Sequence, residues 1–183
     1  IGADPKDKNR ADGLRQLMKA DDFKPNHTEL LLIKKWILDG VAYSDEFRKE
    51  ARNDVAFKGD TVTVFQLYDL MVEAGHITEG HVWLPTFAER GGGYMNGSTK
   101  FLHIFGEKSV EQFYTGMEKR GSTQGAGNGF WAGFIDSYLR FGLNEPERNL
   151  RMANAGGMAS TLWPGNMCGT KNDYQKALDH ING

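Results

Sequence analysis

The spacing of apolar residues predicts helices in the first half of the chain. Residues from about 62 to 74 show it best, with apolar side chains at helical intervals at Val64, Leu67, Tyr68 and Met71. Gly75 follows them as a stop signal. The run 28–38 begins with a threonine suited to an N-cap and is closed by Gly40, so it predicts a short, central helix. Residues 44–51 are polar and predict an exposed helical turn or two.

The second half of the chain predicts further helices. Ser109 and Gln112 have the spacing of a capping box, and apolar residues follow on one helical face at Val110, Phe113, Tyr114 and Met117. An aromatic-rich amphipathic helix is expected after the glycine turn at residue 125, with Gly142 as its stop. Pro146 opens the next helix, and a last helix is expected at about residues 172–181.

Two segments between these helices have a different character. Val82–Pro85 predicts a short strand, whereas residues 91–98 contain so many glycines that we expect a long loop between two halves. Because valine and isoleucine are sparse, the pattern leaves two fold classes open, a helix-rich α/β domain and a mainly α domain. We expect one domain over residues 1–183, with a helical part at about 1–80 and a C-terminal part at 100–183.

Composition excludes several classes of protein. The formal net charge of −2 lacks the basic bias of a surface that binds nucleic-acid phosphates. The chain has no run of roughly 18 apolar residues, so no membrane-spanning helix is predicted. Its single cysteine, Cys168, cannot form an internal disulfide, and we read it as a half-buried apolar residue. These features indicate a soluble protein inside the cell, in the cytoplasm or an organelle.

A glycine turn at residues 125–128, Gly-Ala-Gly-Asn, carries the clearest candidate chemistry. Gly125 and Gly127 permit positive φ angles and close backbone approach, so consecutive N–H groups can converge at the start of a helix. The helix dipole favours an anion at that place, and phosphate oxygens fit such a site. A simpler interpretation of the same residues is a tight turn with Asn128 as the N-cap.

The residues after this turn give the chain a resemblance to a known family. Ala153, Asn154, Ala155 and Gly156 lie in a small-residue helix, and Phe101–Lys108 read as a strand and a turn that contains Gly106. Over residues 100–182 this order resembles the C-terminal half of the ribokinase-type (pfkB) carbohydrate kinases, which implies part of a three-layer α/β fold. The chain departs from the family at Ser109, Ser122 and Gln124, is shorter than its members, and lacks their N-terminal sugar-binding glycine pair.

The resemblance implies a nucleotide site. ATP, with Mg²⁺, would lie near Gly106, Asn154 and Gly156, and its phosphates would meet the N–H groups of Gly125, Ala126, Gly127 and Asn128. The fourth residue of the family's turn is an aspartate that acts as the general base, and here it is Asn128, which cannot accept a proton. We therefore expect a weak or noncatalytic relative that binds a nucleotide and, if active, a sugar.

A second hypothesis is a structural or partner-binding subunit of a larger assembly. Its basis is the cluster of rings that follows the glycine turn, at Phe130, Trp131, Phe134, Tyr138 and Phe141. No metal site is predicted, because His76 and His81 lack the spacing of a helical histidine pair, and Gly75 and Gly80 break the helix that such a site would need. The polar segment 4–13 misses the glycine and glutamate positions of a calcium loop, and the carboxylates between residues 46 and 69 show no distinctive pair.

Overall fold

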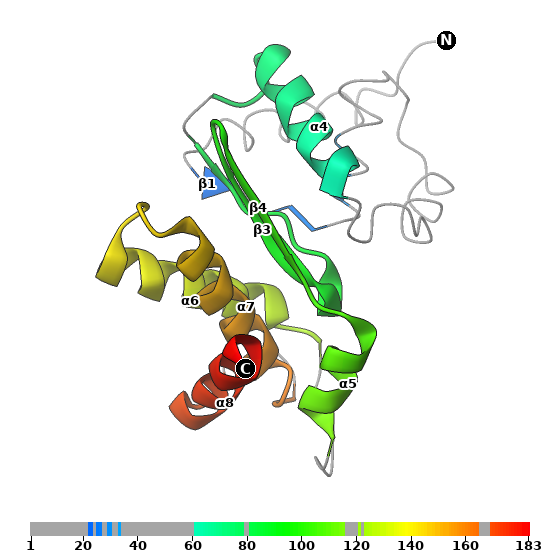
Figure 1. Ribbon diagram of the computed structural model, residues 1–183, viewed down its shortest axis with the longest axis vertical. Helices are drawn as coiled ribbons and strands as arrows, with labels where there is room; N and C mark the ends of the chain where they lie inside the picture. The colour runs from blue at the N-terminus through cyan, green and yellow to red at the C-terminus, as the bar shows by residue number, and fades with distance from the viewer. Residues whose placement is uncertain are drawn as a thin grey trace, which may run out of the picture. The chain divides into compact units, whose positions relative to one another are not determined.

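The computed structural model describes residues 22–23, 25–26, 29–30, 33, 61–78, 81–115, 121, 123–164 and 169–183 (Figure 1). Its contacts divide the chain into two compact units. The first comprises Ile1–Phe87 with Gly93–Leu102, and the second comprises Ala88–Gly92 with His103–Gly183. The strands of one hairpin therefore contribute residues to both units.

The first unit contains helix α4 and most residues of the sheet. The strands β1 (Asp22–Phe23), β2 (Val82–Trp83), β3 (Gly91–Asn96) and β4 (Thr99–Ile104) form a sheet in the order β1-β2-β3-β4. Strand β1 is parallel to β2, and β2 is antiparallel to β3. This sheet excludes the mainly α alternative. The short strand expected at residues 82–85 is confirmed as β2.

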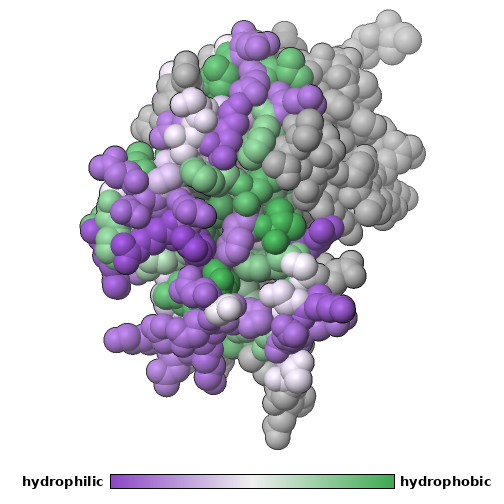
Figure 2. Space-filling model, in the orientation of Figure 1, coloured by the Kyte–Doolittle hydropathy of each residue, from purple (hydrophilic) through white to green (hydrophobic). Residues whose placement is uncertain are grey.

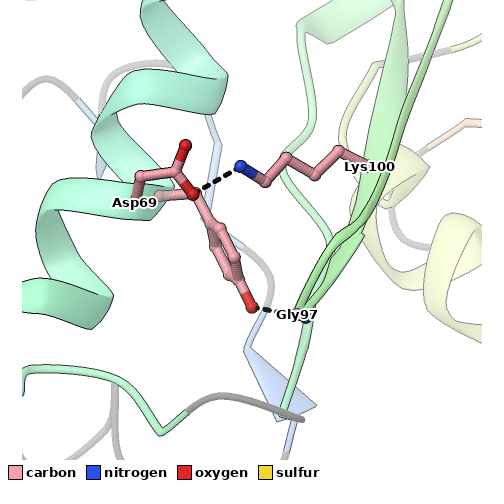
Figure 3. A network of polar contacts seen from close by, with 4 residues as sticks. Asp69, Gly97 and Lys100 are labelled. Carbon is pink, nitrogen blue, oxygen red and sulfur yellow. Dashed lines mark hydrogen bonds and ion pairs between the residues drawn. The ribbon is translucent and has the colours of Figure 1, made fainter.

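Helix α4 spans Thr61–Glu73, as the apolar spacing predicts, and Gly75 ends it with a φ of 69°. Helix α4, the strands β2 and β3 and the segment between these strands contribute many of the buried side chains of this unit, among them Val64, Leu67, Tyr68, Met71, Trp83, Leu84, Phe87, Tyr94 and Met95. Tyr68 Oη accepts the N–H of Gly97 at 2.9 Å, and Lys100 forms an ion pair with Asp69 (Figure 3). The helix is thereby attached to the turn of the β3–β4 hairpin.

The expected loop at residues 91–98 is wrong, because residues 91–96 form strand β3. The glycines that suggested a loop have a steric function in the strand. A Cβ on Gly91, whose φ is 105°, would lie 2.1 Å from the carbonyl oxygen of His103. A Cβ on Gly93 would lie 2.5 Å from Leu102 and 2.9 Å from Pro85. Only glycine fits at these positions, so the neighbouring chain can approach closely.

The helix expected at residues 28–38 is described in part. Glu29, Leu30 and Ile33 are helical, and the two apolar residues are fully buried. The cap is Asn26 rather than Thr28, because Asn26 Oδ1 accepts the N–H of Glu29 and Glu29 Oε2 accepts the N–H of Asn26. The remainder of this helix and the turns predicted at residues 44–51 lie outside the described residues.

The second unit is helical, with the short η3 (Ala88–Arg90) before four longer helices. These are α5 (Glu107–Tyr114), α6 (Ala126–Phe141), α7 (Pro146–Ser160) and α8 (Lys171–Asn182), and α7 packs against both α6 and α8. One apolar cluster joins α5, α7 and α8 through Phe105, Val110, Phe113, Ala155, Met158, Ala159 and Ala177. All four helices were expected from the sequence.

Their ends differ from the sequence expectations in three places. Helix α5 begins after Gly106, so the Ser109 and Gln112 capping box is wrong, and Ser109 Oγ instead contacts His180 Nε2 at 3.1 Å. Helix α6 has Gly125 as its N-cap, which places Asn128 inside the first turn and overturns the Asn128 cap. A capping box that the sequence analysis missed joins Thr170 and Asp173 at the start of α8. In the described part of the chain, no helix is long and apolar enough to cross a membrane.

Candidate functional site

The glycine turn at the start of α6 has the expected positive φ at Gly125 but not at Gly127, which is helical. Gly125 adopts a left-handed conformation, with φ 94° and ψ −16°, which a residue with a Cβ reaches only with strain. The N–H of Ala126 is donated to Thr123 O at 3.2 Å, and that of Gly129 to Gly125 O at 2.9 Å. The first bond closes the turn, and the second begins the helical ladder.

Two backbone N–H groups, those of Gly127 and Asn128, lie between the donors of these two bonds. Among the residues that the structure describes, none accepts a hydrogen bond from the N–H of Gly127 or Asn128. Both belong to the first turn of a 16-residue helix, where the positive end of the dipole lies. Of the four N–H groups expected to meet phosphate, that of Ala126 is engaged within the turn. Within the first turn of the helix, the N–H groups of Gly127 and Asn128 are therefore the donors that an anion could reach.

The side chain of Asn128 is exposed at the start of α6 and makes no capping hydrogen bond. A neutral amide donates and accepts hydrogen bonds but does not take up a proton at neutral pH. At this place Asn128 can orient a hydroxyl group of a ligand, whereas removal of its proton would need another base.

Asn154 lies on the buried side of α7 and is 3% exposed. Its Nδ2 lies 3.2 Å from Nδ1 of His103, and the edge of the Phe105 ring packs against the same imidazole at 4.9 Å between centroids. Burial lowers the pKa of His103, the positive charge of Arg151 lowers it further, and Glu147 opposes both effects. These effects favour the neutral imidazole, and because Nδ2 of Asn154 can only donate, Nδ1 of His103 is its acceptor. The sequence does not single out His103 as a site residue, and a hydrogen-bonded structural role agrees with the contact to Asn154.

Gly106 and Gly156, the other predicted site residues, have contrasting environments. Gly106 is the exposed N-cap of α5, and a Cβ there would meet nothing within 4 Å. Gly156 is buried where α7 crosses α6, and a Cβ there would lie 2.2 Å from the carbonyl oxygen of Gly129 and 3.2 Å from Gly133 Cα. Packing alone accounts for glycine at residue 156, and this crossing brings it beside the first turns of α6.

The same crossing forms a cleft of about 230 Å³ that the sequence analysis missed. Small residues of α6 and α7 line it, together with Asp136, Lys171 and Tyr174. Burial raises the pKa of Tyr174 to about 12, with a further contribution from Asp136. The signal in the sequence is the spacing of Gly125, Gly129 and Gly133 at intervals of four, which permits close helix packing.

Metal ligands are not gathered in the described residues, where no three side chains of His, Cys, Asp or Glu lie close enough to hold an ion. His76 and His81 are described, but Glu79 and Cys168 lie outside the described residues, as does the segment 4–13.

No family model matches the chain, and no curated protein is similar to it in sequence. Among solved structures, phosphofructokinase-2 from Escherichia coli in complex with substrates and products matches with a TM-score of 0.59 and 15% identity over 96% of this chain. The same enzyme in complex with potassium matches with a TM-score of 0.58 and 16% identity over 95% of the chain. Ribokinase from Thermotoga maritima matches with a TM-score of 0.51 and 14% identity over 87%.

These neighbours are carbohydrate kinases of the pfkB family. The chain therefore has a helix-rich α/β fold of the ribokinase-like type, in agreement with the fold class predicted from the sequence. It spans 45% of the length of the Escherichia coli enzyme and 42% of the Thermotoga maritima enzyme. At this identity the likeness concerns the fold alone.

Proposed function

We propose that this chain is a pfkB-like, carbohydrate-kinase-related domain that binds the phosphates of ATP at the start of α6. The observation that supports this function best is the left-handed Gly125 followed by the N–H groups of Gly127 and Asn128, for which no described acceptor exists. The ribokinase-like fold agrees with such a site. Asn154 and Gly106 are proposed to border the adenine ring, and Mg²⁺ would accompany the phosphates.

Asn128 decides how much catalysis the proposed site can support. In the family an aspartate takes the proton of the substrate hydroxyl, and general-base catalysis contributes a factor of roughly 10² to 10⁴. The exposed amide of Asn128 retains the position of that group without its basicity. We therefore propose a degenerate phosphotransferase, which binds nucleotide and transfers its phosphoryl group slowly or not at all.

A thermal-shift titration with Mg-ATP tests the nucleotide site. The informative variant is Gly125→Ala, because a Cβ at a φ of 94° distorts the turn that presents the N–H groups. Gly142→Ala is its matched control, since Gly142 has a φ of 68° at the other end of the same helix. Each substitution costs about 1–2 kcal/mol of backbone strain. Only Gly125→Ala should abolish the stabilisation by Mg-ATP.

The Asn128→Asp variant tests the proposed degeneracy. Release of ADP from Mg-ATP is measured with fructose 6-phosphate and with ribose as acceptors. We expect the rate of ADP release to rise by roughly 10²-fold or more over the unchanged chain for an accepted sugar, because a base is restored.

Two results of the thermal-shift titration would contradict the nucleotide site. One is equal stabilisation by Mg-ATP in the Gly125→Ala and Gly142→Ala variants, and the other is no stabilisation of the unchanged chain.

A specific observation also favours the second candidate, a noncatalytic partner-binding subunit. The aromatic side chains on which this candidate depends differ in exposure, because Phe130 and Phe134 are buried while Tyr138 is 45% exposed. Aliphatic side chains join Tyr138 on the outside of α6, where Ile135 is 47% and Leu139 is 77% exposed. Absence of any Mg-ATP effect together with a partner on this surface would favour this candidate over the kinase-related one.

A further inference from the structure

The solvent-facing side of α6 is apolar over its C-terminal half. Ala132, Ile135 and Leu139 are all exposed, and their spacing of three and then four residues places them in one stripe along the helix. The buried Phe130 and Phe134 lie on the opposite side of α6, and Gly129 and Gly133 approach α7 closely. A helix that is apolar on both sides is normally covered on both sides.

Other helices of the same unit do not share this property. The exposed positions of α8 carry polar or charged side chains, such as Asn172, Gln175, Lys176 and Asp179. Figure 2 accordingly shows mainly hydrophilic residues over α8. Leu143, just beyond the end of the helix, is also 37% exposed. Exposed apolar side chains that adjoin one another mark interaction surfaces more often than scattered ones do.

Two charges accompany the stripe, and both lie on the same flank. Arg140 Nη2 lies 2.9 Å from Asp136 Oδ1, as an i,i+4 ion pair on the surface of the helix. Residues 136 and 140 follow Ile135 and Leu139 by one position each, so the flank carries one negative and one positive charge beside the two largest aliphatic side chains.

This arrangement is complementary to itself when two copies of α6 run antiparallel. In such a pair, Ile135 of the first copy can lie opposite Leu139 of the second copy. Arg140 of the second copy then lies level with Phe134 of the first copy. That level is about 3 Å along the helix axis from Asp136 of the first copy. A two-fold axis brings equal flanks together, so each Asp136 lies beside the other copy's Arg140. In a parallel two-fold pair the charged flanks would lie on opposite sides of the interface, so Asp136 and Arg140 of the two copies would not meet.

We propose that the stripe formed by Ala132, Ile135 and Leu139 is a dimer interface that binds the α6 stripe of a second copy of this chain. The inference deepens the partner-binding candidate and uses no group of the nucleotide site. Failure of Mg-ATP to bind therefore leaves it unchanged, and a monomeric chain leaves the nucleotide proposal unchanged.

Sedimentation velocity of the full chain over a range of concentrations tests the proposal. The unchanged chain should form a dimer, and Leu139→Lys should raise the dissociation constant at least tenfold, because it places two lysines in the apolar stripe. Gln112→Lys is the matched control, since it adds the same charge at an exposed position of α5. Circular dichroism establishes that both variants remain folded.

Charge reversal tests the antiparallel arrangement itself. Asp136→Arg leaves two positive groups on the flank, and Arg140→Asp leaves two negative ones. Each variant alone should be monomeric, whereas an equimolar mixture should form the heterodimer. A monomeric unchanged chain, a dimer that tolerates Leu139→Lys, or a mixture that stays monomeric would overturn the proposal.

Discussion

Two neighbouring glycines of α7, Gly156 and Gly157, should respond in opposite ways to the same added methyl group. A Cβ at residue 156 would lie 2.2 Å from the carbonyl oxygen of Gly129, whereas a Cβ at residue 157 would lie 3.3 Å from that of Ala126. The first distance is shorter than van der Waals contact by about 1 Å and the second by about 0.1 Å. Because the obstructing atom at residue 156 belongs to the backbone of α6, the helices must separate.

The magnitudes follow from two opposing effects. Replacing glycine by alanine inside a helix gains about 1 kcal/mol of helix propensity at either position. Overpacking a close interface costs about 1–3 kcal/mol, and the upper part of that range applies where no side chain can move aside. We expect Gly156→Ala to lose about 1–2 kcal/mol of unfolding free energy and Gly157→Ala to gain up to about 1 kcal/mol. The gap between the two is about 2 kcal/mol.

Urea unfolding followed by circular dichroism measures this gap, and thermal unfolding should show it as about 4–8 °C for a chain of this size. The two variants have the same composition, so effects on the unfolded chain largely cancel in the comparison. Equal stabilities for Gly156→Ala and Gly157→Ala would refute the close crossing of α6 and α7.

Two further predictions concern single titrating groups. The pKa of His103, followed by its imidazole NMR signals, should lie below 6.5. Because folding favours the neutral imidazole, the stability that it contributes is present above pH 6.5 and is lost as the pH falls toward the lowered pKa of the folded state. A measured pKa at or above 6.5 would contradict the buried environment of His103. Asp173 accepts hydrogen bonds from Thr170 and from Trp163 Nε1, and these bonds lower its pKa below 3.8. Asp173→Ala should lower the free energy of unfolding by about 1 kcal/mol at neutral pH. The difference in stability from the unchanged chain should vanish as the pH falls through the lowered pKa of Asp173 in the folded state. A difference in stability that is independent of pH would argue against the carboxylate as the capping group.

The helices of the chain were predictable from sequence because their apolar residues repeat with the helical period over several turns. The strand β3 was not, because the glycines at residues 91 and 93 gave no alternation to read. Their function depends on Leu102, Pro85 and the carbonyl of His103, which come from other parts of the chain. A steric requirement between distant segments leaves no periodic signal in the strand that satisfies it.

Some features of the candidate site were likewise predictable from the sequence, and others were not. The left-handed turn at Gly125 was predictable, since the need for a positive φ is local. Residue 156, in contrast, has a packing role that depends on where α7 meets α6. The lowered pKa of His103 likewise depends on burial and on the charge of Arg151, which lies 48 positions later in the chain. Sequence spacing cannot reveal either arrangement.

The bond from the Gly97 amide to the phenol of Tyr68 joins residues 29 positions apart in the chain. A hairpin turn is usually the most local event of β-sheet folding, and a shift of pairing by one residue reverses which side chains face inward. Here the turn amide gains its partner only when α4 has come into place. Contact with α4 therefore stabilises the correct pairing of β3 with β4 over pairings shifted by a residue. We expect the hairpin to reach its final register late in folding, because formation of this nonlocal contact is slow.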